Sequence, residues 1–370
     1  MQRSSTILGM GAYIPEQRRG NDYWPESLVK QWGTKTVVSL QGEREKNAAK
    51  MHPALVAELE RYKDDYFMGT RERRIAPADM LPSEMTAIAC EEALNDAGVA
   101  AEDVDLLIVS SVPGDHPVPP NVYRVHHRIR AVNARCFELD AACNAFQFSW
   151  DVAHAYITSG LAKRVLIGIS TKYSSIVDDT SSLSIVAGDG AVAAVIGGCP
   201  RELGLQHSLL RTETVFHDAL YVTRRAPTRS ALPAFEYGPR QSNERALLSV
   251  NDKEKASAFF AKIPDYAAEI RRDLVDANGI SPEAIALLVV NGSRAYLSAV
   301  VAKILGVPLS KVEDNVLEFG NIGPATLPMN LYTAYKKGRL SDGDNVLMFG
   351  HGGGASYGGT LFRWHRGERR

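Results

Sequence analysis

Short apolar runs alternate with stretches of helical periodicity through both halves of the chain. Strands are expected at residues 6–15, 104–112, 135–139, 165–170, 191–197, 284–290, 345–349 and 359–364. Helices are expected at residues 53–62, 83–98 (with Ser83 as N-cap), 122–130, 146–157, 255–278, 295–305 and 329–337. Continuous apolar runs are typical of strands buried on both faces, and strand–helix alternation produces parallel or mixed sheets covered by helices. The sequence therefore predicts an α/β fold.

Composition excludes several classes of protein. The 370 residues are 45% hydrophobic, enough for a large core, and the net charge of −1 gives no basic field for nucleic acid or membrane. No apolar run is long enough to span a bilayer, and the first residues lack the pattern of a secretory signal. Cysteines at 90, 136, 143 and 199 have no C-x-x-C spacing, which predicts a protein of the reducing cytoplasm without a disulfide framework or zinc site. No metal and no cofactor are expected.

Cys143 lies where the apolar run 135–139 passes through small residues into the helical stretch 146–157. A thiol at the N-terminal end of a helix is favoured as thiolate, and its own backbone N–H can help to stabilise an oxyanion. Cys143 is therefore a candidate nucleophile. The alternative is a small buried core cysteine, which is how most free cysteines are used.

Four further patterns occur in the order found in one enzyme family. They are residues 67–76, 140–146 around Cys143, the Gly-Asp-Gly-Ala turn within 187–191, and the triple-glycine segment 350–358. In these segments the chain resembles β-ketoacyl-acyl-carrier-protein synthase III, a thiolase-like condensing enzyme. The resemblance covers nearly the whole chain except about 22–65, which is either a helical surface insertion or part of the acyl pocket.

The resemblance implies the architecture of the molecule. It implies a thiolase-like fold with two similar α/β halves, residues 1–200 carrying the cysteine and residues 201–370, stacked in five αβαβα layers. It also implies a homodimer with residues 113–121 near the interface. The polar stretch 211–243 is expected to bridge the two halves.

The same resemblance implies the site. Cys143 would be acylated, and the backbone N–H groups of Cys143 and Gly353 would form the oxyanion hole, since glycine allows close approach of backbone to substrate. The alternative for the glycines is a flexible surface loop. The family's Cys–His–Asn set reads Cys143, Asn291 and Asn321 in this chain. This is a departure, because an amide can donate a hydrogen bond but cannot take a proton from a thiol.

Two other histidines are candidates for the missing imidazole. His351 precedes the triple glycine, where the family usually has a phenylalanine, and it is expected to act as base or donor near Cys143. The alternative is that His351 packs against Tyr357 or caps backbone groups. His116 lies in the loop that reaches the neighbouring subunit's site in related dimers. Arg294 occupies a position where the family often has an asparagine.

The expected function is acyl transfer. An acyl group from acyl-CoA or acyl carrier protein would load onto Cys143 and pass to a malonyl-type thioester, a hydroxyl or an amine, in polyketide, secondary-metabolite or fatty acid biosynthesis. The alternatives are a catalytically silent partner subunit and a thiolase-like Claisen enzyme, although no second cysteine lies near residues 350–354. Two basic clusters are either docking sites for coenzyme A or the carrier protein, or solvated surface: Arg124, Arg128, Arg130 and Arg135; and Arg224, Arg225 and Arg229.

Overall fold

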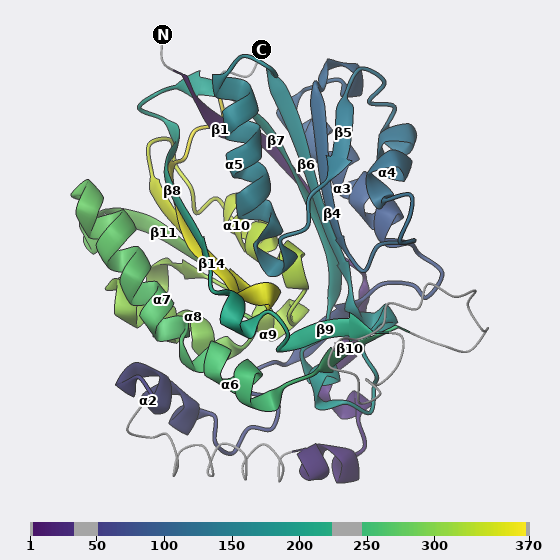
Figure 1. The fold of residues 1–370 in the computed structure, drawn as a ribbon, viewed down its shortest axis with the longest axis vertical. Coiled ribbons are helices and arrows are strands. Elements are labelled where there is room, and N and C mark those ends of the chain that lie inside the picture. Colours follow the sequence, from purple (N-terminus) through teal and green to yellow (C-terminus); the bar gives the residue numbers. More distant parts are fainter. Residues whose placement is uncertain (1–2, 33–50, 224–245, 368–370) are drawn as a thin grey trace.

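The computed structural model describes residues 3–32, 51–223 and 246–367, and Figure 1 shows two sheets with helices between and outside them. One outer layer contains α3 (Pro82–Ala97) and α4 (Asn121–Ile129), and the middle layer contains α5 (Ala145–Thr158) and α10 (Thr326–Lys336). The other outer layer contains α6 (Lys253–Ala261), α7 (Ile263–Ile270) and α8 (Ala295–Leu305). The predicted thiolase-like, five-layer α/β fold is confirmed.

Both sheets have five strands and the same internal arrangement. The first has the order β1 (Arg3–Tyr13), β7 (Asp189–Pro200), β6 (Arg164–Lys172), β4 (Leu106–Val112) and β5 (Arg135–Glu138). The second has the order β8 (Gly204–Thr212), β14 (Ser356–Arg363), β13 (Asn345–Gly352), β11 (Ile285–Val290) and β12 (Val312–Glu313). In each sheet two strands at one end pair antiparallel, and the other three run parallel.

The apolar middle layer joins the two sheets. Phe146 and Trp150 of α5 are 1% and 0% exposed, so both rings are removed from water. The ring of Trp150 lies 4.8 Å from that of Phe362 on β14, which connects the helix of one half to the sheet of the other. Complete burial of a large apolar side chain contributes about 1.5–3 kcal/mol, so these two rings stabilise the contact between the two halves.

Most predicted elements are confirmed within one to three residues, but the helix expected over 255–278 is wrong. It is broken into α6 and α7, followed by a π turn, Arg271–Val275, and a 3-10 turn, Asp276–Asn278. Pro264 near the start of α7 has no backbone N–H to continue the hydrogen-bond ladder of α6, which accounts for the first break.

Two local expectations are corrected as well. Ser83 is not the N-cap of α3, because Leu81 occupies that position and the hydroxyl of Ser83 donates to Asp115 at 2.5 Å. Of the stretch 211–243, the described part forms the end of β8 and then β9 (Leu220–Thr223), which pairs with β10 (Leu247–Val250). Residues 224–243, including the second arginine cluster, lie outside the described residues.

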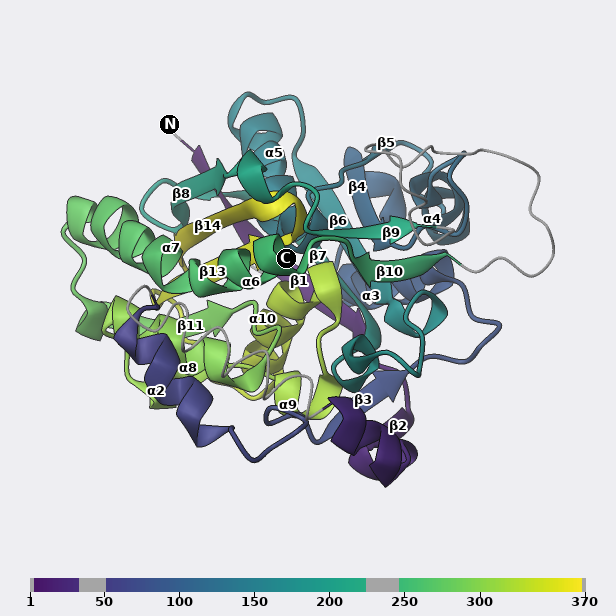
Figure 2. The ribbon, with the colours of Figure 1, turned by 60° about the horizontal axis from the view of Figure 1, so that its bottom comes forward.

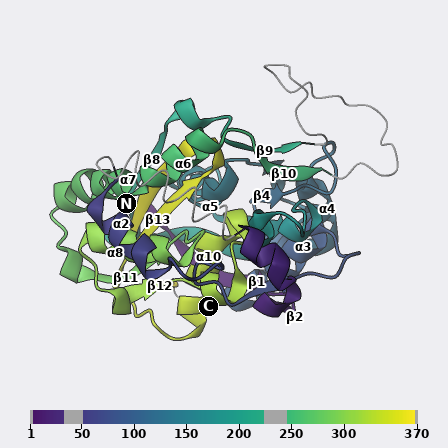
Figure 3. The same cartoon turned by 90° about the horizontal axis from the view of Figure 1, so that it is seen from below.

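The described residues between β1 and α3 pack against the rest of the molecule through helix α2 and through strand β3. Helix α2 (Pro53–Arg61) buries Leu55 and Leu59 against Val300 of α8, and the two helices lie side by side in Figures 2 and 3. The short strands β2 (Gln17–Gly20) and β3 (Glu72–Ile75) pair antiparallel nearby. Helix α9 (Val316–Phe319) packs beside β3.

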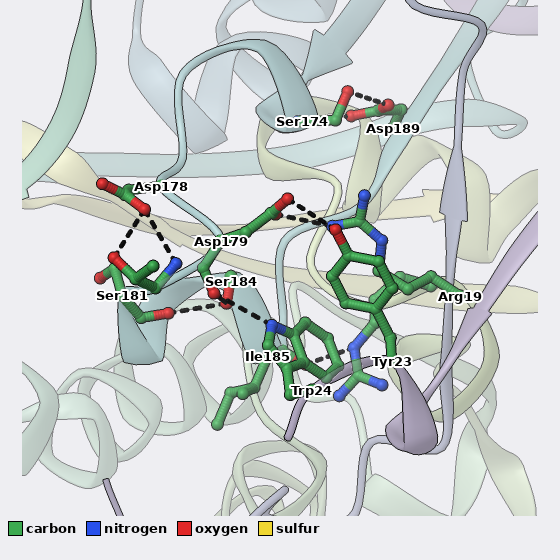
Figure 4. A network of polar contacts seen from close by, with 12 residues as sticks. Arg19, Tyr23, Trp24, Ser174, Asp178, Asp179, Ser181, Ser184, Ile185 and Asp189 are labelled. Atoms are coloured by element: carbon green, nitrogen blue, oxygen red, sulfur yellow. Dashed lines mark hydrogen bonds and ion pairs between the residues drawn. The ribbon is translucent and has the colours of Figure 1, made fainter. Parts of the chain in front are cut away.

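A polar network anchors the loop that follows β6 (Figure 4). Asp179 accepts hydrogen bonds from Arg19 and Tyr23, both at 2.8 Å, and its carbonyl accepts one from the indole of Trp24 at 3.1 Å. At the start of the loop, the hydroxyl of Ser174 donates to Asp189 at 2.6 Å. These contacts fix the turn that begins at residue 173.

No helix within the described ranges is sufficiently long and apolar to cross a membrane. In the same ranges, no group of three or more His, Cys, Asp or Glu side chains is arranged to hold a metal ion.

Candidate active site

Cys143 lies in a 3-10 turn, Ala142–Asn144, directly between β5 and α5. The predicted position at a strand-to-helix turn is therefore what the structure shows. Ala142 has φ of 48°, a left-handed conformation that costs a residue with a side chain about 1–2 kcal/mol. Asp140 offsets part of this cost by accepting the Ala142 N–H at 2.9 Å. The turn thus holds Cys143 at the N-terminal end of α5.

Burial and nearby donors act in opposite directions on the pKa of the Cys143 thiol. Burial raises the pKa of the thiol, while the backbone N–H of Gly353 and the hydroxyl of Tyr173 lower it, as does the N–H of Cys143 itself to a smaller extent. The expected lowering of the pKa by the helix end is outweighed by burial. The two backbone N–H groups predicted for the oxyanion hole nevertheless lie beside the sulfur.

Sequence reasoning missed Tyr173. It opens the 3-10 turn after β6, is 8% exposed, and lines the cavity that contains Cys143. Gly323 makes room for it, because a side chain at Gly323 would come within 2.7 Å of the tyrosine hydroxyl. The available signal was its place directly after a parallel strand, since the carboxyl ends of β4, β5 and β6 meet at one edge of the sheet.

Asn291 uses its amide group to hold backbone. Its Nδ2 donates to the carbonyl of His351 at 2.9 Å and to that of Cys143 at 3.4 Å. Because both partners are carbonyls, the amide must turn its NH₂ group toward them, and Oδ1 faces away from them. Oδ1 is buried and has no hydrogen-bond partner among the described residues. Asn291 thus has its oxygen, and not its NH₂ group, left without a partner among the described residues.

Asn321 has the opposite orientation. Its Oδ1 accepts the N–H of Gly323 at 2.8 Å and the hydroxyl of Thr326 at 3.3 Å. The oxygen end of the amide is therefore occupied, and Asn321 also lines the cavity. This arrangement leaves the NH₂ group as the end available to a bound molecule.

The glycines around His351 are part of β13 rather than a flexible loop, and only Gly353–Ala355 forms a turn. Side chains alternate between the two faces of a strand. A Cβ on Gly352 would lie 3.0 Å from the backbone nitrogen of Cys143, and one on Gly350 would lie 2.0 Å from Oδ1 of Asn144. Glycine at these positions lets β13 approach the turn that carries Cys143.

His351 therefore projects from the opposite face of β13. Its ring is 6.1 Å from the ring of Phe259 and 6.4 Å from that of Phe260, both on α6. Burial lowers the pKa of His351 to about 4, so the ring is neutral, and Nδ1 has no partner. The described structure contains no hydrogen bond between His351 and Cys143. The role of His351 as the base for the Cys143 thiol stays a prediction. The position of the ring against Phe259 and Phe260 does not favour it.

The candidate residues surround one cavity of about 1810 Å³. Cys143, Asn291, Asn321, His351 and Gly353 all line it. The described lining does not include His116, which is exposed in the loop before α4. Such a volume exceeds the 300–1,000 Å³ or so of ordinary small-molecule pockets, so it has room for a chain-like substrate.

Apolar side chains of α2 and its flank form part of the cavity wall: Met51, Leu55 and Leu59. Strands β9 and β10 and helix α6 supply other parts of the wall. Of the two alternatives for the stretch 22–65, the described part therefore supports a share in the pocket.

Two similar sheets with a thiol at a strand-to-helix turn give the chain a thiolase-like fold with a candidate cysteine nucleophile. The family model for 3-oxoacyl-[acyl-carrier-protein] synthase III matches residues 137–214, and the model for the C-terminal part of that family matches residues 275–364. Together with the 30% identity to a curated synthase III over 80% of the chain, these matches show that the chain belongs to the β-ketoacyl-acyl-carrier-protein synthase III family.

Curated relatives carry the same name. Beta-ketoacyl-[acyl-carrier-protein] synthase III of Bacillus pumilus is 30% identical over 300 residues, covering 80% of this chain and 88% of the relative. The synthase III of Clostridioides difficile is 27% identical, covering 98% of this chain and 99% of the relative.

Solved structures agree on the fold. The priming β-ketosynthase of the R1128 polyketide pathway has a TM-score of 0.77 and 25% identity, covering 98% of this chain and 97% of that one. The synthase III of Aquifex aeolicus has a TM-score of 0.75 at 23% identity, covering 97% and 100%.

Proposed function

We propose that the chain accepts an acyl group from a coenzyme A or acyl-carrier-protein thioester onto Cys143 and passes it to a second nucleophile. The thiolate would attack the thioester carbonyl, forming a new C–S bond while the donor thiol leaves and takes up a proton. One observation carries the proposal: the sulfur of Cys143 lies with the N–H of Gly353 at the wall of the large cavity. Curated relatives are named for acyl carrier protein, which supports a carrier or coenzyme A donor.

The other residues are proposed to share the remaining tasks. The N–H groups of Cys143 and Gly353 would bind the carbonyl oxygen of the acyl group as negative charge develops on it. Asn321 would donate its NH₂ group to the carbonyl of the second substrate. Asn291 would keep the backbone of Cys143 and His351 together, and Tyr173 would donate a hydrogen bond to the thiolate.

A second candidate reaction is transfer to a hydroxyl or an amine. Asn291 favours it, because its buried Oδ1 lacks a partner and an O–H or N–H group would supply one. Decarboxylative condensation on a malonyl-type thioester instead needs donors on the acceptor's carbonyl, and of the two asparagines only Asn321 retains a donor toward the cavity. Product analysis with malonyl, alcohol and amine acceptors separates the two reactions.

Acyl loading is tested by intact-mass spectrometry after incubation with a panel of acyl-CoA thioesters. A mass increase equal to the acyl group is expected, and Cys143→Ala should abolish it. Cys90→Ala and Cys136→Ala are matched controls that should keep the adduct. An adduct that persists in Cys143→Ala contradicts the mechanism, and a lack of any adduct favours the silent-partner alternative.

We further propose a homodimer that works in the cytoplasm in polyketide, secondary-metabolite or fatty acid biosynthesis. The four cysteines are free thiols, which supports a reducing compartment. The similarity to a priming ketosynthase of a polyketide pathway supports a role in starting chains.

A further inference from the structure

Arg294 is a cation in the wall of the cavity that has no counter-ion among the described residues. It lies just after β11, at the N-cap of α8, and lines the same cavity as Cys143. In the described part of the chain it makes no hydrogen bond and no ion pair. Burial lowers the pKa of its guanidinium, and no carboxylate acts in the other direction. A charge that is partly removed from water in this way is costly unless an anion compensates it.

Two carboxylates, one close to Arg294 and one in the cavity wall, accept hydrogen bonds from other groups. Asp314, beside the turn that leads to Arg294, accepts the hydroxyl of Ser298 and the N–H of Val316. Asp140 lines the cavity but accepts the N–H of Ala142. The positive charge is reinforced by a second arginine: after burial, Arg294 is the next cause that lowers the pKa of Arg73.

Two neutral donors accompany the guanidinium. Ser293 and Tyr296 both line the cavity within the same turn. The hydroxyl of Ser293 is buried without a hydrogen-bond partner, and that of Tyr296 has none among the described residues. Burial raises the pKa of Tyr296, so its hydroxyl stays protonated and can donate. Ser293, Arg294 and Tyr296 thus bring three donors to the cavity wall, none of which has an acceptor among the described residues.

We propose that Ser293, Arg294 and Tyr296 form a binding site for a carboxylate carried by a thioester substrate. A guanidinium can hold a carboxylate through two parallel N–H···O bonds, and two hydroxyls can satisfy the remaining lone pairs. The proposal rests on the proposed function, since it assigns a charged substrate class to the same cavity. The carboxylate lies either at the far end of the acyl group that loads onto Cys143 or on the second substrate.

The first test compares two acyl donors of the same shape. Loading of Cys143 is followed by intact-mass spectrometry with glutaryl-CoA and with 5-methylhexanoyl-CoA, in which an isopropyl group replaces the carboxylate. The rate ratio of glutaryl to 5-methylhexanoyl should exceed one and should fall about 30-fold or more in Arg294→Met, as expected for removing one partner of a desolvated charge pair. Lys303→Met, which removes an exposed cation from the same helix, should keep the ratio.

The second test locates the carboxylate. If Arg294→Met leaves the loading ratio unaltered but abolishes consumption of malonyl-CoA by the acylated enzyme, the carboxylate belongs to the second substrate, which also supports the site. If Arg294→Met slows every coenzyme A thioester yet spares N-acetylcysteamine thioesters, which carry no phosphate, the anion is a phosphate and the proposal is overturned. Equal rates for all substrates in both proteins overturn it as well.

Two milder variants protect the test against misfolding of Arg294→Met. Tyr296→Phe and Ser293→Ala each remove one hydroxyl and should lower the same ratio by a smaller factor. A failure of this proposal remains distinguishable from a failure of the proposed function. In the first case adducts on Cys143 form without preference for a carboxylate, and in the second case no thioester gives an adduct.

Discussion

At the scale of single residues, the hydroxyl of Tyr173 and the backbone N–H groups of Gly353 and Cys143 lower the pKa of the Cys143 thiol. These donors stabilise the thiolate, but they cannot remove its proton as a histidine would. The pKa of Cys143 stays above its ordinary value of 9.0 because burial outweighs the donors. Only a small thiolate fraction is therefore present at neutral pH, and the rate of acylation should rise with pH through the neutral range.

Tyr173→Phe should slow alkylation of Cys143 by iodoacetamide roughly tenfold or more at neutral pH, the equivalent of one charge-assisted hydrogen bond. The sign follows from the donor: the tyrosine hydroxyl lowers the pKa of the thiol, so its removal moves the pH–rate profile to higher pH. Tyr156→Phe, on α5, is the control and should leave the profile in place. An unmoved profile in Tyr173→Phe would show that the hydroxyl does not act on the sulfur.

His351→Phe is expected to change the rate of acyl loading by less than about tenfold. The ring projects from the face of β13 opposite to Gly352, which contacts Cys143, and its low pKa keeps it neutral. Loss of a general base would instead cost about 10²–10⁴ in rate. Quenched-flow mass spectrometry of the acyl-enzyme measures the difference. A loss of that larger size would restore His351 as the base predicted from the sequence.

At the scale of elements, contact between strand β13 and the turn that carries Cys143 depends on glycine. Gly350→Ala would place a Cβ 2.0 Å from Oδ1 of Asn144 and 2.2 Å from Oε1 of Gln147. Because the surrounding core is closely packed, this substitution should lower the free energy of unfolding by about 1–3 kcal/mol. Urea denaturation followed by circular dichroism measures it.

Gly353→Ala provides the matched control. The nearest atom to a Cβ at Gly353 is Cβ of Ala142, at 3.9 Å, and the N–H that reaches Cys143 is retained. We therefore expect stability to change by less than about 1 kcal/mol. Equal effects of Gly350→Ala and Gly353→Ala would contradict the close approach of β13 to α5.

At the scale of the whole molecule, one edge of the first sheet has the features of an interface. Among the described strands, β5 ends that sheet. Near it, Val118 and Tyr123 are 81% and 54% exposed. An edge strand with neighbouring apolar side chains favours association with a second copy. This arrangement supports the proposed homodimer, with the loop 113–121 at the contact.

The double variant Val118→Glu/Tyr123→Glu should weaken self-association roughly 30-fold or more, as expected when a central apolar contact is lost. Sedimentation velocity over a concentration series measures it. Leu309→Glu, an equally polar change at an exposed site of the second sheet's edge region, is the control and should leave association unchanged. A wild-type protein that stays monomeric at all concentrations would contradict the homodimer.

The sequence by itself determined the elements and the position of the candidate nucleophile. Buried strands and amphipathic helices leave periodic apolar patterns that depend on neighbours along the chain, so the alternation could be predicted in both halves. The position of Cys143 between a strand and a helix follows from the same local pattern. Pro264 could have predicted the break between α6 and α7, because a proline inside a helical stretch interrupts the hydrogen-bond ladder. The apolar periodicity continues on both sides of it, which is why one continuous helix was expected.

Only the tertiary structure decided what surrounds the thiol. Tyr173 reaches Cys143 because three parallel strands end at one edge, and His351 turns away because β13 must present glycine to α5. The orientation of the Asn291 amide depends on two carbonyls from distant segments. Arg294 has no counter-ion among the described residues because the nearby Asp314 accepts hydrogen bonds from Ser298 and Val316 instead. These properties arise from contacts between residues far apart in the chain, and local sequence patterns do not encode them.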